Sequence, residues 1–302
     1  MNARNKSFRL LLVSIILVFG GGWLAAMVQT GAGQVDVQDI RFKSAQDATM
    51  SALLYVPDNA DASTPAPAVM AVHGYINSRE TQSPYAIELS RRGYVVLALD
   101  QRGHGYSAPP VFAEGFGAPA GLAYLRSLDF IDTSQIVLSG HSMGGWSVLS
   151  AAVAYPENYS AVIISGSSTG LFGVPEGDAK FPRNFALLSG KYDEFTGFMW
   201  GSPKADDIVN AEKLKHLFDT ESAVQEGILY GNVAAGTARK LYQPVQTHPA
   251  NHITHSGIAG VLDWVQLTTS PPNPLSPDDQ VWQWKEFGTL VSLPISAGGF
   301  TH

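Results

Sequence analysis

Hydrophobic and polar positions alternate along the body of the chain in blocks that predict strands and helices in turn. Continuous apolar runs, which are typical of strands buried on both faces, occupy residues 68–72, 94–100, 136–140, 161–166 and 185–190. Helix-like spacing of apolar residues fills the intervals at 78–92, 120–128 and 143–155. The pattern therefore predicts repeated units in which a buried strand is followed by a helix.

The flanking segments complete this pattern. Residues 37–57 read as two strands joined by a polar turn near Gln46 and Asp47, and residues 238–245 read as a further strand. An amphipathic helix at 256–267 closes the domain. The fold class that we predict is α/β: a mostly parallel eight-stranded sheet with helices on both faces, in one domain over residues 34–268.

The first thirty-three residues read as a membrane segment. Three basic residues, Arg4, Lys6 and Arg9, precede an uncharged apolar stretch at 10–28, and the next charge is Asp36. This stretch has about the length that a spanning helix needs and is long for a signal peptide. Small residues at 25–26 and 30–33 leave a cleaved signal open. Because the basic residues come first, the domain is expected outside the cytoplasm, either membrane-anchored or secreted.

The segment 269–302 raises a second membrane question. A Pro-rich polar linker is followed by Trp282, Trp284 and Lys285, which suit the membrane–water interface, and then by an apolar stretch. The apolar part, residues 287–300, is too short to span a bilayer by itself. Two interpretations stay open: the start of a further membrane segment, or a tail that packs on the domain.

Composition and charge exclude several classes of function. The formal net charge is −7 and no run of Lys or Arg follows residue 10, so the chain lacks the basic patch that nucleic-acid binding requires. It contains no cysteine, which excludes disulfides, a thiol nucleophile and a cysteine-ligated zinc site.

The stretch GHSMGG at 140–145 carries the first candidate chemistry. Ser142 stands between the strand at 136–140 and the helix at 143–155, and Gly140 and Gly144 remove Cβ atoms where the turn is crowded. Such a turn lifts the Ser142 hydroxyl above the sheet edge and points the Met143 amide toward a developing oxyanion. We therefore predict that Ser142 is a nucleophile.

A serine nucleophile needs a base and an acid that orients the base. Asp193 follows the strand at 185–190, at the carboxyl edge where sites of parallel sheets gather, and Glu194 is its rival. We favour His252 as the base, with His248 and His255 as competitors.

The spacing of these three histidines would suit a metal on a helix. Pro249, Asn251 and Gly257 indicate a loop instead, and no carboxylate cluster accompanies the histidines, so no metal is expected.

The order Ser142, Asp193, His252 is the order found in α/β-hydrolases. Over residues 36–268 the chain resembles that superfamily, and it looks closest to bacterial membrane-anchored serine hydrolases of the esterase, dienelactone-hydrolase-like or serine-aminopeptidase-like type. HGY at 73–75 matches the oxyanion loop of the family, which implies that the Tyr75 amide is an oxyanion donor beside Met143. DQRGHGYS at 100–107 matches a family segment that implies a structural loop beside the pocket.

The resemblance implies a carboxylic-ester hydrolase that works through an acyl-enzyme, acts on a small-molecule ester and needs no cofactor. A peptidase or amidase with the same triad, and a non-catalytic scaffold on this fold, remain the alternatives. The cap is expected to be short, and a longer insertion lies at 195–235. The expected substrate pocket is bordered by apolar residues of these segments and of the helix at 143–155: Trp146, Leu171, Phe172, Phe198 and Trp200.

Overall fold

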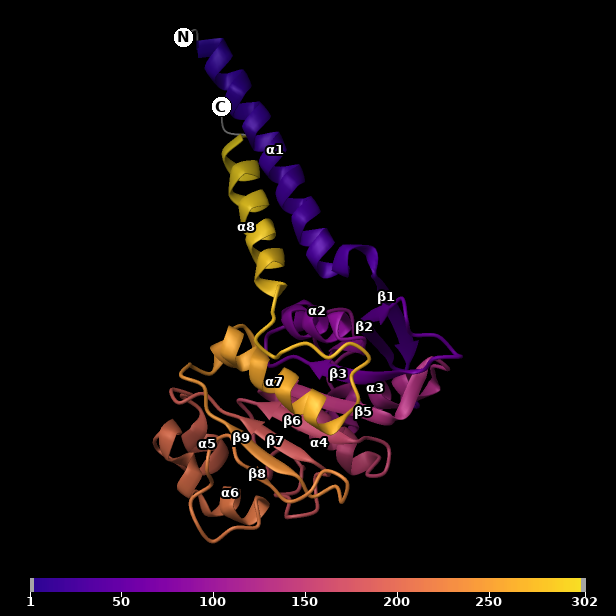
Figure 1. The fold of residues 1–302 in the computed structure, drawn as a ribbon, viewed down its shortest axis with the longest axis vertical. Coiled ribbons are helices and arrows are strands. Elements are labelled where there is room, and N and C mark those ends of the chain that lie inside the picture. Colours follow the sequence, from indigo (N-terminus) through magenta and orange to yellow (C-terminus); the bar gives the residue numbers. More distant parts are fainter. Residues whose placement is uncertain (1–2, 300–302) are drawn as a thin grey trace.

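A twisted mixed sheet forms the centre of the computed structural model, which describes residues 3–299 (Figure 1). Its strand order is β1-β2-β4-β3-β5-β6-β7-β9-β8, with nine strands in all. The strands are β1 (Val35–Lys43), β2 (Thr49–Pro57), β3 (Ala66–Val72), β4 (Val95–Asp100), β5 (Ile131–His141), β6 (Ala161–Ser165), β7 (Phe185–Leu188), β8 (Leu229–Tyr230) and β9 (Arg239–Tyr242).

The six central strands, β4, β3, β5, β6, β7 and β9, run parallel, whereas β1, β2 and β8 pair antiparallel at the two sides. The predicted fold class is confirmed, with one strand more than the eight expected. The extra strand is β8, which has only two residues and no apolar run, so no sequence pattern announces it. The parallel arrangement brings the carboxyl ends of β3, β5, β7 and β9 to one edge of the sheet.

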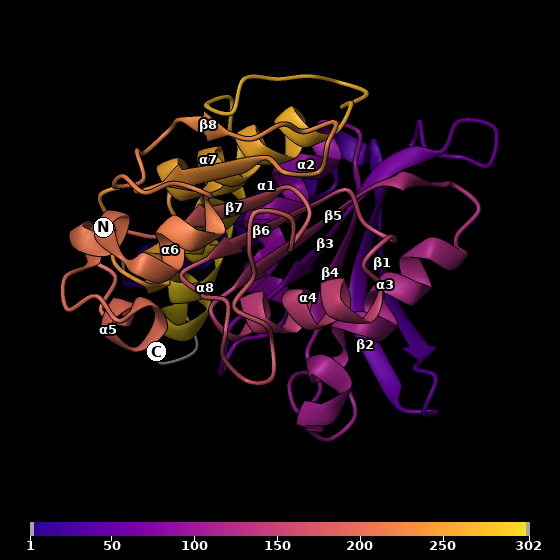
Figure 2. The same cartoon turned by 90° about the horizontal axis from the view of Figure 1, so that it is seen from below.

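Two helical layers explain why the central strands are apolar throughout. Helices α2 (Ser83–Arg91) and α7 (His255–Thr268) cover one face, and α3 (Ala118–Ser127) and α4 (Met143–Ala154) cover the other (Figure 2). Successive residues of a strand point to opposite faces. In β3, Val69 joins the core beneath α2 and α7, whereas Met70 joins the core beneath α3 and α4.

Short elements supply the connections. The insertion between β7 and β9 contains α5 (Thr196–Trp200), η4 (Ala205–Asn210) and α6 (Glu212–Leu217), at the end of the molecule farthest from α1 (Figure 1). Further 3₁₀ turns lie in other loops: η1 (Gly31–Gly33), η2 (Arg79–Gln82), η3 (Phe112–Gly117) and η5 (Pro249–His252).

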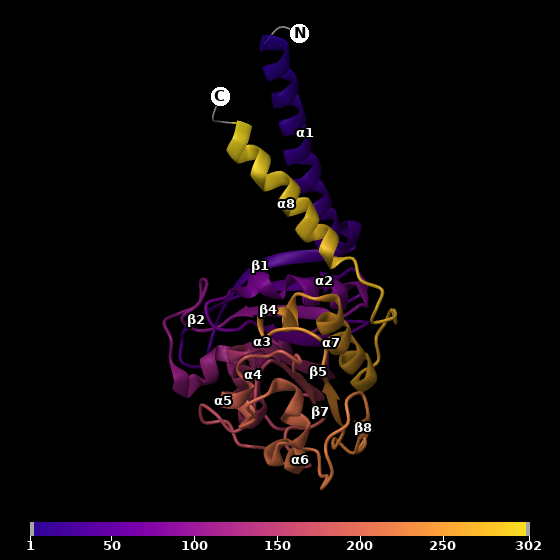
Figure 3. The same ribbon diagram turned by 90° about the vertical axis from the view of Figure 1, so that its left-hand side faces the viewer.

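Helices α1 (Ala3–Gln29) and α8 (Trp282–Gly299) project together from the domain (Figures 1 and 3). The stretch Ser7–Gln29 of α1 is long and apolar enough to cross a membrane, a property that signal sequences share. α8 packs along α1, and its first turn also contacts α2 of the domain. Residues 300–302 of the expected apolar tail lie outside the described residues.

Candidate active site

Ser142 occupies a strained turn between β5 and α4. Its backbone has φ 52° and ψ −119°, a conformation that L-residues rarely adopt and that persists where surrounding structure enforces it. A Cβ on Gly140 would overlap the backbone oxygen of Gly144, and a Cβ on Gly144 would overlap the backbone oxygen of Val72. The Ser142 amide donates to Ser165 O at 2.9 Å, which fixes the turn against β6.

Two backbone amides beside this turn are unpaired. Neither the Tyr75 nor the Met143 N–H donates a hydrogen bond to any group within residues 3–299, and the Ser142 hydroxyl is likewise unpartnered there. Met143 opens α4, where the first amides lack intrahelical acceptors and carry the positive end of the helix dipole. A Cβ on Gly74 would lie 3.1 Å from Ser142 Cβ, so the loop of Tyr75 adjoins the serine.

The HGY and DQRGHGYS motifs meet at this loop. His73 Nδ1 donates to Gly74 O at 2.7 Å, and its Nε2 accepts the Gln101 N–H at 3.1 Å. Burial lowers the pKa of His73 to about 4, so the ring stays neutral and keeps both bonds at neutral pH. The Ile76 amide donates to His104 Nε2 at 3.3 Å, which makes His104 a support of the loop that carries Tyr75.

The buried carboxylate of Asp193 is held by His248. His248 Nδ1 donates to both carboxylate oxygens at 3.0 Å, and the amide of Phe195 donates to Oδ1 at 3.0 Å. Glu194, the rival acid of the sequence analysis, accepts the backbone N–H of His248 at 3.0 Å. The two adjacent acids therefore fix the same histidine, one through its ring and the other through its backbone.

His252, the base expected from the sequence, makes no hydrogen bond to Asp193. It ends the short turn η5, and its ring lies 4.1 Å from the ring of His141, centroid to centroid. Its Nδ1 is buried without a partner among the described residues. Burial, together with the nearby ring of His248, lowers the pKa of His252 to about 4. The third candidate, His255, begins α7 and lies exposed beside Asp278.

Asn251 is a site residue that sequence reasoning missed. It is fully buried, and its Nδ2 donates to Asp193 Oδ2 at 2.9 Å. Its Oδ1 accepts the Gly190 amide at 3.1 Å and the Gln246 side-chain amide at 2.9 Å. In the sequence, Asn251 indicates only a loop, because its partners at 190 and 193 are distant along the chain.

Three of the five expected pocket residues form an aromatic cluster. The ring of Trp146, one turn beyond Ser142, lies 4.5 Å from Phe172 and 6.3 Å from Phe198. Phe172 and Phe198 are 56% and 59% exposed, so their faces are available to a ligand. Trp200 is buried and donates through its indole nitrogen to a backbone oxygen at 3.0 Å, and Leu171 packs against the core. These two side chains face inward.

The arrangement combines an accessible hydroxyl, two unpaired amides beside it, and an imidazole oriented by a buried carboxylate. Those are the parts that acyl transfer through a serine requires. Within residues 3–299, no group of three or more histidine, aspartate or glutamate side chains is placed to hold a metal ion.

Two protein-family models match the region that contains these residues. The model described as "Serine aminopeptidase, S33" matches residues 63–175, and the model described as "Putative esterase" matches residues 126–225. The first match includes the loop of Tyr75 and the turn of Ser142, and the second includes Ser142 and Asp193.

Similar proteins include a monoacylglycerol lipase of Mycolicibacterium smegmatis, 35% identical over 32% of this chain and 35% of that protein. An epoxide hydrolase of Caballeronia sordidicola is 30% identical over 47% of this chain and 42% of its own length. The chain thus matches less than half the length of either relative. A solved bacterial heroin esterase aligns with 77% of this chain and 83% of its own, at TM-score 0.54 and 14% identity, which shows the fold alone.

Proposed function

We propose that this chain, which belongs to the α/β-hydrolase superfamily, is a serine hydrolase that cleaves carboxylic esters through an acyl-enzyme. The observation that carries the proposal is the hydrogen-bonded pair of His248 and Asp193 at the sheet edge where Ser142 lies half-buried in its strained turn. The proposal assigns the base to His248 in place of His252, because His248 alone has its Nδ1 on the buried carboxylate.

In the proposed reaction, Ser142 Oγ attacks the ester carbonyl carbon while His248 Nε2 takes the hydroxyl proton. The amides of Tyr75 and Met143 donate to the oxyanion of the tetrahedral intermediate. The bond to the alcohol breaks as His248 returns the proton to the leaving oxygen. Water, activated by His248, then attacks the acyl-enzyme and releases the acid, and Asp193 stabilises the imidazolium in both steps.

The nucleophile favours esters over epoxides as the substrate class. Epoxide hydrolases of this fold carry an aspartate at the turn, and here the residue is Ser142. The exposed rings of Phe172 and Phe198 beside Trp146 offer an apolar surface for the acyl or alcohol group. One relative is named a monoacylglycerol lipase, which agrees with an apolar substrate.

The proposed location is a membrane surface outside the cytoplasm. α1 supplies the anchor in residues 1–33, with its basic residues at the cytoplasmic end, and residues 34–268 form the catalytic domain. Cleavage of this segment as a signal would instead release the domain.

Turnover of short-chain p-nitrophenyl esters by the purified protein tests the function. We expect hydrolysis by the parent chain, its loss in Ser142→Ala, and its retention in Ser134→Ala, a control at an exposed serine. Aminoacyl p-nitroanilides, offered in parallel, test the peptidase alternative that the serine aminopeptidase family match favours. A folded parent that cleaves only the anilides contradicts the ester assignment, and one that cleaves neither class indicates a scaffold.

A further inference from the structure

Helix α8 carries large apolar side chains that are more than half exposed. Phe287, Leu290 and Leu293, three residues apart along one side, are 53%, 63% and 59% exposed. We propose that α8 is a second bilayer segment, paired antiparallel with α1, so that two helices and not one hold the domain at the membrane. The inference rests on the proposed role of α1 as an anchor.

The two helices pack through glycine at the closest point of their contact. A Cβ on Gly21 would lie 2.5 Å from Gly288 O, and a Cβ on Gly288 would lie 2.6 Å from Gly21 O. The next small residues, Ala25 and Ser292, stand four positions farther along and also border the contact. Small residues at four-residue spacing let helix backbones approach closely, as helices packed within lipid do.

The direction of α8 is fixed at its base by buried charges of α2. Glu88 Oε1 accepts the backbone N–H groups of Val281 and Trp282, at 2.6 and 2.9 Å, and so caps the start of α8. The fully buried Arg92 pairs with Glu88 at 3.0 Å and donates to Ser276 O and Asp279 O of the preceding linker. These hydrogen bonds hold the linker on the domain and orient the start of α8 so that the helix runs along α1.

Lipid is the partner that fits this helix pair. Four consecutive residues of a helix point in four different directions around its axis. Each of Leu10, Leu11, Leu12 and Val13 is nevertheless about half exposed, so within the described residues no protein surrounds this part of α1. The stretch Ser7–Gln29 has 23 residues, about 35 Å of helix, against a hydrocarbon core of about 30 Å. Residues 287–299 of α8 carry no charge and lie beside the apolar part of α1.

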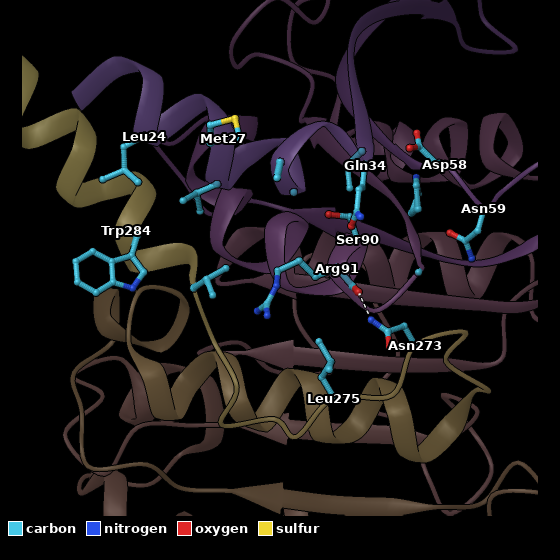
Figure 4. A pocket seen from close by; sticks show the side chains of 17 residues that line it. Leu24, Met27, Gln34, Asp58, Asn59, Ser90, Arg91, Asn273, Leu275 and Trp284 are labelled. Carbon is cyan, nitrogen blue, oxygen red and sulfur yellow. Dashed lines mark hydrogen bonds between the residues drawn. The ribbon is translucent and has the colours of Figure 1, made fainter. Parts of the chain in front are cut away.

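A cavity lies where α1 and α8 meet the domain, and we place the boundary of the hydrocarbon core at this cavity. It has a volume of about 810 Å³ and lies between α1, α8 and the domain (Figure 4). Leu24, Met27 and Trp284 line it from the helices, whereas Arg91 and Asn273 line it from the domain. Apolar side chains from the helices and polar side chains from the domain, with a tryptophan among them, suit the headgroup layer of a membrane.

The antiparallel pairing has a consequence for topology. From its contact with Gly21 at Gly288, α8 continues to Gly299 in the direction of the basic end of α1. In the proposed arrangement, α8 therefore runs into the hydrocarbon layer toward the side on which α1 begins.

Spin labels can test the environment of α8 directly, because the chain has no cysteine and one introduced thiol gives one label. Three full-length variants are reconstituted in vesicles of phosphatidylcholine and phosphatidylglycerol: Leu290→Cys in α8, Phe19→Cys in α1, and Val245→Cys on the domain. All three positions are exposed in the structure. We expect the labels at 290 and 19 to collide with oxygen and lose collisions with a water-soluble nickel chelate, and the label at 245 to do the reverse.

The outcomes separate the two proposals. Nickel access at 290 together with protection at 19 overturns the bilayer role of α8 and leaves the anchor intact. Nickel access at both positions contradicts the anchor itself, and with it the inference.

The glycine contact provides a matched control for the pairing. Gly21→Leu places a side chain against Gly288, whereas a Cβ on the neighbouring Gly22 meets no atom within 4 Å. With labels at 19 and 290, we expect a longer label-to-label distance in Gly21→Leu and an unchanged distance in Gly22→Leu. Equal distances in the parent and both variants would overturn the pairing.

Discussion

Replacement of either His248 or His252 by alanine distinguishes a catalytic imidazole from a packed one. His248 has its Nδ1 3.0 Å from both oxygens of Asp193, so His248→Ala removes the proposed base and leaves a buried carboxylate without its main partner. General acid–base catalysis of this kind contributes up to roughly 10⁴-fold, so we expect kcat to fall by about 10³- to 10⁴-fold, or about 4–5.5 kcal/mol in the barrier.

His252→Ala should act on stability instead. Its ring packs against His141 and its Nδ1 has no hydrogen-bond partner within residues 3–299, so truncation leaves a cavity that costs about 2–4 kcal/mol of unfolding free energy. His252→Phe keeps a ring at this position and serves as the matched variant. We expect both His252 variants that fold to retain kcat within about tenfold, because they lose no proton-transfer group.

The assay is hydrolysis of p-nitrophenyl butyrate under saturating substrate, with folding of every variant checked by circular dichroism and thermal unfolding. The reasoning is refuted if folded His252→Phe loses as much kcat as folded His248→Ala, or if His248→Ala stays active.

Three further predictions concern the support of the site. Asn251→Ala removes three buried hydrogen bonds and should lower the unfolding free energy by about 3–5 kcal/mol. It should also reduce kcat by a larger factor than it changes KM. An unchanged denaturation midpoint would argue against this role of Asn251. His73 and His252 have a pKa of about 4 in the folded chain against about 6.5 unfolded, so the unfolded state binds more protons between these values. Stability should therefore fall as the pH drops from 6.5 to 4, by about 3 kcal/mol for each ring, and urea titrations across this range that show no decline would contradict the assignment. Gly144→Ala should cost about 3 kcal/mol or more, since its Cβ overlaps a backbone oxygen, whereas Gly197→Ala, whose nearest atom is 3.8 Å away, should unfold close to the parent temperature.

Local pattern was sufficient for the sheet and for the position of Ser142. Continuous apolar runs mark the central strands because helices cover both of their faces, and the glycines around Ser142 mark a turn with no room for Cβ atoms. The place of Asp193, just beyond the end of β7, follows from the same logic.

The local sequence pattern could not decide which of the three histidines pairs with Asp193. His248 and His252 stand four residues apart in one short turn, and which ring faces Asp193 depends on contacts with Glu194 and Asn251. Asn251 lies 58 residues from Asp193 along the chain, so spacing alone cannot rank the histidines. The pairing of α8 with α1 is non-local for the same reason, although Trp282, Trp284 and the following apolar stretch pointed to the segment.

Covalent labelling of the nucleophile tests directly whether Ser142 is the reactive serine. The purified full-length chain is incubated with a fluorophosphonate, its intact mass is measured, and the modified peptide is sequenced by mass spectrometry, with Ser142→Ala and His248→Ala alongside. We expect one adduct per chain on Ser142, none in Ser142→Ala, and much slower labelling in His248→Ala. A folded parent that takes up no phosphonate, or that takes it up at another residue, would contradict the role of Ser142 as the nucleophile.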